Sequence, residues 1–134
     1  MSYAKAMLDT YPRDFTVDAD VLARCIDACH DCAQACNACA DDCLSEDSVA
    51  ELVKCIRLNE DCADICVAAG RIANRQTEYD ANVTRAVVKA CATVCRACGD
   101  ECERHADMHE HCRICAEACR ACEDACQALL TAMA

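Results

Sequence analysis

Cysteine is the residue type in this sequence whose number and spacing could do chemistry, since 18 of the 134 residues are cysteine. Within each group, neighbouring cysteines are three or four residues apart, apart from one step of seven in the second group. The groups are Cys25, Cys29, Cys32, Cys36, Cys39 and Cys43; Cys55, Cys62 and Cys66; Cys91, Cys95, Cys98 and Cys102; and Cys112, Cys115, Cys119, Cys122 and Cys126. Thiolates are soft ligands that select Cu(I), Zn(II) or iron–sulfur clusters. The cysteines therefore predict a metal-binding function.

The spacing of the cysteines is that of the inner stripe of a helix in a bundle, because steps of four and three alternate along a heptad seam. A purely structural role is disfavoured, since leucine would bury more apolar area at the same positions. Disulfides are also disfavoured. Cysteines three or four residues apart in a regular helix do not meet the narrow geometry of a disulfide, and a chain with two glycines and one proline has little turn structure.

The choice of metal follows from charge and from the sharing of ligands. C-x-x-C pairs such as Cys29 and Cys32 occur, but they lie inside helices and share members with C-x-x-x-C pairs, so they are weak indicators of zinc. Four thiolates around Zn(II) leave two negative charges in the core, whereas Cu(I) replacing each thiol proton leaves it neutral. If each sulfur bridges two ions, about 18 Cu(I) ions bind per chain. A Zn(II) or iron–sulfur protein, as a metal buffer or electron carrier, is the alternative.

A second set of possible ligands lies where the third helical segment meets the fourth. His105, Met108 and His109 continue the seam there, and imidazole and thioether groups are also copper ligands. We expect them to form a mouth through which metal is loaded, although solvated loop histidines and a core-filling methionine are the simpler interpretations. His111 lies beside this cluster but off the seam and ranks lower. His30 falls on an outer face and is expected at the surface.

Asn59 occupies a seam position in the second helical segment where a cysteine would be expected. Two interpretations stay open. A buried asparagine can fix the register of packed helices, or its side-chain carbonyl can approach a bound ion.

Four long helical segments position these residues, at about 17–44, 49–74, 78–104 and 108–133, after a short helix at about 3–9. Their expected N-terminal signals are Thr16 and the capping boxes Ser48–Glu51 and Thr77–Asp80. Short connections make neighbouring helices antiparallel. The prediction is an all-α fold, an up-down-up-down four-helix bundle forming a single domain of residues 1–134. The end away from the mouth is expected to be closed by apolar side chains, namely Leu22, Ala69, Ile72, Val87, Val88, Leu129 and Leu130.

The net charge, the N-terminal sequence and the positions of the cysteines limit the partners, location and activity that we expect. A net charge of −11 argues against binding to nucleic acid or to an anionic membrane. The chain starts without a basic stretch followed by an apolar one, so no secretory signal is predicted and a cytosolic location is expected, where thiols stay reduced. Redox cysteines lie at helix starts or in electropositive pockets, and only Cys25 and Cys91 come near a helix start. No catalytic activity is predicted.

The cysteine register, the His and Met mouth and the missing leader together resemble the bacterial copper storage proteins of the cytosolic branch. The resemblance implies a four-helix bundle that holds many Cu(I) ions, assembles into homotetramers, and keeps copper for cuproenzymes or against toxicity. Copper chaperones or recipient cuproenzymes would be its partners. It also implies that Asn59, His105, Met108 and His109 bind ions near the open end. Unlike the exported branch, this chain has a His-rich mouth and no twin-arginine leader, so methane oxidation is not implied as the destination of the copper.

Overall fold

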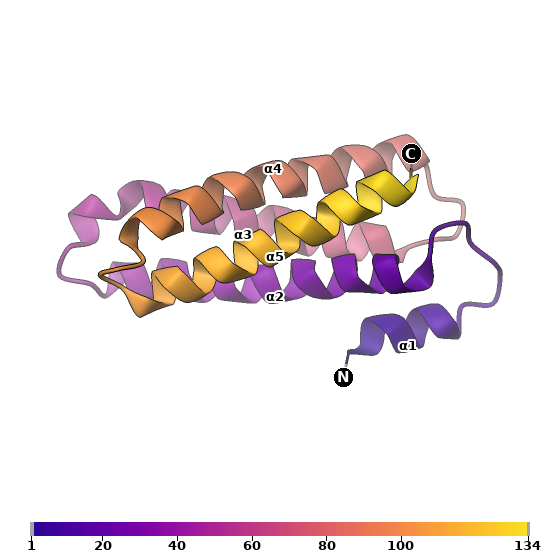
Figure 1. Cartoon of the computed structure of the whole chain (residues 1–134), viewed down its shortest axis with the longest axis horizontal. Helices are drawn as coiled ribbons and strands as arrows, with labels where there is room; N and C mark the ends of the chain where they lie inside the picture. The colour runs from indigo at the N-terminus through magenta and orange to yellow at the C-terminus, as the bar shows by residue number, and fades with distance from the viewer. Residues whose placement is uncertain (1, 134) are drawn as a thin grey trace.

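Four long antiparallel helices make up most of the fold in the computed structural model, which describes residues 2–133 (Figure 1). The described elements are α1 (Tyr3–Asp9), α2 (Ala19–Leu44), the short 3-10 helix η1 (Val49–Glu51), α3 (Val53–Asn74), α4 (Ala81–His105) and α5 (Glu110–Met133). Both α2 and α4 pack against α3 and α5, which closes the four long helices into a ring. The predicted all-α four-helix bundle is confirmed. Residues 1 and 134 of the predicted domain lie outside the described residues.

The short helix α1 lies along the outside of α2 near the start of the bundle (Figure 1). Leu8 is the buried residue of α1. The Lys5 ammonium lies 2.6 Å from the Asp9 carboxylate and 3.5 Å from that of Asp20. One apolar anchor and the Lys5–Asp20 ion pair, which contributes little in water, therefore dock α1 against α2, while the Lys5–Asp9 pair lies within α1.

Aspartates, not the predicted threonines, cap α2 and α4. The Asp18 carboxylate accepts hydrogen bonds from the backbone N–H groups of residues 20 and 21, and the Asp80 carboxylate from those of residues 82 and 83. The predicted caps Thr16 and Thr77 are wrong, and the Thr77 hydroxyl instead pairs with that of Tyr11 at 2.8 Å. An aspartate in the right position satisfies free N–H groups as well as threonine does, so these helices begin later than predicted.

The predicted capping box Ser48–Glu51 also does not cap a helix. The segment forms the 3-10 helix η1, and α3 begins only at Val53, after Leu52. Leu52 is almost completely buried at this end of the bundle. Burial of a leucine side chain is worth about 1.5–3 kcal/mol, more than the roughly 1 kcal/mol of a typical cap, so tertiary packing decides the local conformation here.

Sulfur fills the core between the helices. All 18 cysteines are buried and free. At the end of the bundle where α2 begins and α5 ends, the apolar side chains Leu22, Ala69, Val88 and Leu129 are buried as predicted, and Val87 and Leu130 pack against them. Among the helices of residues 2–133, none is both long enough and apolar enough to cross a membrane.

Candidate metal centre

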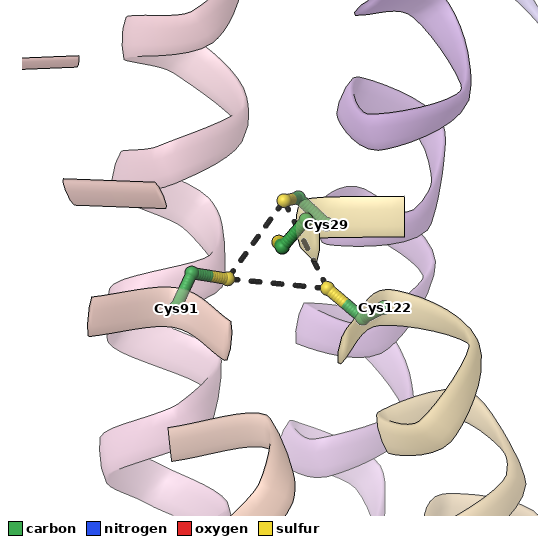
Figure 2. A group of neighbouring side chains, drawn as sticks. Cys29, Cys91 and Cys122 are labelled. Carbon is green, nitrogen blue, oxygen red and sulfur yellow. Dashed lines mark hydrogen bonds between the residues drawn. The ribbon is translucent and has the colours of Figure 1, made fainter. Parts of the chain in front are cut away.

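The thiols of different helices meet across the core. Figure 2 shows one such contact, in which Cys29 of α2, Cys91 of α4 and Cys122 of α5 point toward one another. The three sulfur–sulfur distances of this triangle are each 3.9 Å. Contacts along one helix are equally close, since the Cys32 and Cys36 sulfurs lie 3.7 Å apart. An ion placed here would therefore have thiols both along a helix and between helices within reach.

Groups of four thiols converge along the core, with all ligand atoms of a group within 4.8 Å of one another. They include Cys29, Cys91, Cys122 and Cys126; Cys32, Cys66, Cys95 and Cys122; Cys32, Cys36, Cys62 and Cys119; and Cys36, Cys98, Cys115 and Cys119. They are not isolated, however, because each shares at least one sulfur with the next. The core is thus a continuous series of overlapping sites.

Distance alone does not select the metal. In the last of these groups the Cys36 sulfur lies 3.6 Å from Cys115, 3.7 Å from Cys119 and 4.0 Å from Cys98. A tetrahedron with Zn–S bonds of about 2.3 Å has edges of about 3.8 Å, so zinc would fit one group. Shared sulfurs prevent neighbouring groups from each holding a separate four-thiolate ion. Such sharing favours a soft ion whose thiolate ligands bridge to the next ion. Cu(I) is such an ion, and it also keeps the core neutral when it replaces the thiol protons.

The 18 buried cysteines form a sulfur column along the core of the bundle. Asn59 is fully buried within this column. Its side-chain oxygen accepts hydrogen bonds from the thiols of Cys98 and Cys115, both at 3.0 Å, and of Cys102 at 3.6 Å. Its amide nitrogen donates to the Cys55 sulfur at 3.5 Å. The carbonyl oxygen therefore lies among three thiols, where it can approach an ion shared by them. This is the placement that the second interpretation of Asn59 requires.

The mouth lies where the α4–α5 connection meets the α2–η1 connection. His111, ranked below the other mouth residues from the sequence, has its ring against the thiols. Its Nδ1 atom lies 3.4 Å from the Cys39 sulfur and 3.6 Å from that of Cys112. With Cys43 these residues form a group whose ligand atoms lie within 4.8 Å of one another. The low ranking of His111 is corrected, because the first turn of α5 aims its ring inward.

The other predicted mouth residues contact carboxylates or solvent. His105 pairs through Nε2 with the Glu101 carboxylate at 3.1 Å, and His109 through Nδ1 with the Glu46 carboxylate at 2.6 Å. The Met108 side chain is 65 % exposed, so it does not fill the core. His30 is exposed, as predicted.

Two carboxylates at the mouth were missed from the sequence. Glu101 is buried near the end of α4, where its carboxylate lies 3.1 Å from Arg104 and 4.0 Å from Lys54. Its position four residues before His105 is a usable helical signal. No local signal marks Glu46, because its partner His111 is 65 residues away.

Burial and hydrogen bonding determine the protonation of two groups at the mouth, the Cys43 thiol and the Glu46 carboxyl. Burial raises the pKa of the Cys43 thiol to about 11. The hydrogen bond from His111, with a further contribution from the nearby His109, lowers the pKa of the Glu46 carboxyl. At neutral pH Cys43 therefore carries its proton, while Glu46 is a carboxylate.

We expect metal loading to release protons. A thiol whose pKa lies near 11 is protonated at neutral pH, and an ion can bind only its thiolate form. Anaerobic addition of Cu(I) to weakly buffered protein, followed with a pH electrode, should release close to one proton for each thiol that binds copper. A much smaller release would show that the core already holds thiolates.

The bundle and its sulfur column define a class of protein, one that holds many soft metal ions inside a helical scaffold. The sequence model of the family described as Csp, copper storage protein, matches residues 18–131. The chain belongs to the copper storage protein family.

Solved structures and one curated relative place the chain within this family. The copper storage protein Ccsp from Streptomyces lividans, loaded with 10 copper equivalents, is 64 % identical, with a TM-score of 0.95 over 96 % of this chain and 98 % of that one. Cu(I)-bound BsCsp3 from Bacillus subtilis is 40 % identical, with a TM-score of 0.70 over 79 % of this chain and 94 % of that one. An uncharacterized cysteine-rich protein of Bacillus subtilis, YhjQ, is 41 % identical over 53 % of this chain, and the match spans 62 % of its length.

Proposed function

We propose that this protein stores Cu(I) in the cytosol by binding the ions to the thiolates of its core. The observation that carries the proposal is the set of 18 buried, free cysteines arranged in overlapping groups. Bridging thiolates and a monovalent ion keep such a core neutral. The copper-loaded Streptomyces lividans relative supports the choice of metal, and that protein is described as cytosolic. Copper is the cargo here, and the proposed role is storage without catalysis.

The proposed ligands are the 18 cysteines together with Asn59 and His111. Asn59 contributes its carbonyl oxygen within the column, and His111 contributes Nδ1 at the mouth, beside Cys39 and Cys112. We assign His105, Met108 and His109 to the outer mouth, where imidazole and thioether donors can pass ions inward. The chain forms one domain that contains all of these groups.

An anaerobic Cu(I) titration read by native mass spectrometry tests the proposal. We expect saturation near 18 ions per chain, because the core supplies one thiolate for each ion. The same spectra report assembly, for which the resemblance implies a homotetramer. Saturation at a few ions, displacement of Cu(I) by Zn(II), or visible absorption from an iron–sulfur cluster would contradict Cu(I) storage.

A protein that stores Cu(I) for supply must receive the ions from a donor and release them to a recipient. Copper chaperones that deliver Cu(I) and cuproenzymes that receive it are the proposed partners. Cu(I) transfer from the loaded protein to a copper-free chaperone, followed after separating the two proteins, tests this step. Retention of all copper in the presence of excess chaperone would argue for detoxification instead of supply.

A further inference from the structure

Glu46 lies in the α2–η1 connection, where the backbone holds it at the rim of the mouth. Its N–H donates to the carbonyl of Cys43 at 3.2 Å, and its carbonyl accepts from the N–H of Val49 at 3.2 Å. The side chain is 31 % exposed. The carboxylate is therefore fixed at the boundary between solvent and the outermost thiols.

One oxygen of this carboxylate contacts two histidines, His109 of the α4–α5 connection and His111 of the first turn of α5. Glu46 Oε2 lies 2.6 Å from His109 Nδ1 and 2.9 Å from His111 Nε2. The two imidazole rings stack, with centroids 5.4 Å apart and planes 18° apart. A carboxylate can only accept hydrogen bonds, so His111 Nε2, which hydrogen-bonds to Glu46 Oε2, carries a hydrogen.

The hydrogen on His111 Nε2 determines what its other nitrogen can do. In a neutral imidazole with Nε2 protonated, Nδ1 keeps a free lone pair. That nitrogen faces the sulfurs of Cys39 at 3.4 Å and Cys112 at 3.6 Å. A lone pair aimed at two thiols can accept a thiol proton or bind a metal ion that the thiolates share.

We propose that Glu46 is a positioning residue, which holds His111 in the Nε2-protonated form and aims Nδ1 at the outermost thiols, so that Cu(I) is captured there first. The inference rests on the proposed function and adds a residue that acts through His111 without touching the ion. Carboxylates behind metal-binding histidines fix the ring and raise its basicity, and their loss typically weakens binding 10–100-fold.

An exposed carboxylate in the first turn of α5 supplies the control. Glu110 directly precedes His111 and pairs with the Arg113 guanidinium. Among residues 2–133, the thiols that hydrogen-bond to a histidine are those of Cys39 and Cys112, and both contact His111. Loss of Glu110 should therefore alter the charge beside the mouth without removing the partner of a ring that faces thiols.

The experiment compares Glu46→Ala, Glu46→Gln and Glu110→Ala with the original chain. Transfer of the first Cu(I) equivalent from a soluble chelator should slow by about 10-fold or more in Glu46→Ala. Glu46→Gln keeps an acceptor oxygen and should load at a rate between those of the original chain and Glu46→Ala. Glu110→Ala removes only an exposed ion pair and should change the rate by less than about 2-fold. Nitrogen-15 spectra of the imidazoles should show His111 Nε2 protonated in the original chain and a mixture of tautomers in Glu46→Ala.

A His111→Ala background separates positioning from simple attraction of cations. If Glu46 acts through His111, Glu46→Ala causes no further slowing in that background. Equal slowing with and without His111, or an unchanged tautomer in Glu46→Ala, would overturn the inference. The total Cu(I) capacity is measured in parallel and should stay near that of the original chain. A capacity of only a few ions in every variant would instead reject the proposed storage function.

Discussion

Cu(I) loading is expected to raise the free energy of unfolding by more than 10 kcal/mol. A ligand present at 100 times its dissociation constant stabilises the state that binds it by about 2.7 kcal/mol per site. Four such sites already contribute about 11 kcal/mol, comparable with the 5–15 kcal/mol that stabilises a typical domain. The effect is large because the proposed ions join sulfurs of different helices, such as Cys29, Cys91 and Cys122.

Guanidinium unfolding of the metal-free and loaded forms, followed anaerobically by far-ultraviolet circular dichroism, measures this difference. The loaded form should remain folded at denaturant concentrations that fully unfold the metal-free form. Removal of copper with an excess of chelator is the control and should restore the original midpoint. Coincident midpoints before and after loading would mean that copper binds outside the core.

Leu129→Ala is expected to lower the free energy of unfolding of the metal-free form by about 2.5–5 kcal/mol, the usual cost of truncating a buried leucine. Leu129 is 1 % exposed and lies in the apolar end of the bundle, one turn beyond the last cysteine, Cys126. Most of the core consists of small thiols and alanines, so the few large apolar side chains carry a disproportionate share of the stability.

Urea unfolding under reducing conditions measures this cost, with Leu44→Ala as the matched control. Leu44 is 58 % exposed, so its truncation should change stability by less than about 0.5 kcal/mol. The Cu(I) capacity of Leu129→Ala should equal that of the original chain, because no sulfur is removed. Similar losses in the two variants would mean that the apolar end does not support the bundle.

The sulfur column could be predicted from the sequence because helical periodicity is a local property. Alternating steps of three and four place side chains on one face of any regular helix, and all 18 cysteines are indeed buried. The helix starts were less predictable. Several residues near each start can cap, and Asp18 and Asp80 cap α2 and α4 in place of the predicted threonines.

The mouth was predicted less well, because periodicity stops where helices end. Residues 106–109 leave the helical path between α4 and α5, so the seam could not be continued through them to His109 and His111. After this short turn, side chains point in directions that the periodicity of α4 does not predict. As a result His111 faces Cys39, while Met108 faces solvent.

The sequence by itself determined the fold class, the sulfur-lined interior and the kind of metal such an interior suits, since these follow from residue type and helical period. Only the tertiary structure decided which thiols share an ion site, where the Asn59 oxygen lies, and which histidine contacts the column. These are contacts between helices and connections far apart in the chain. Glu46 and His111 meet across 65 positions because packing of the helices brings the α2–η1 connection against the first turn of α5.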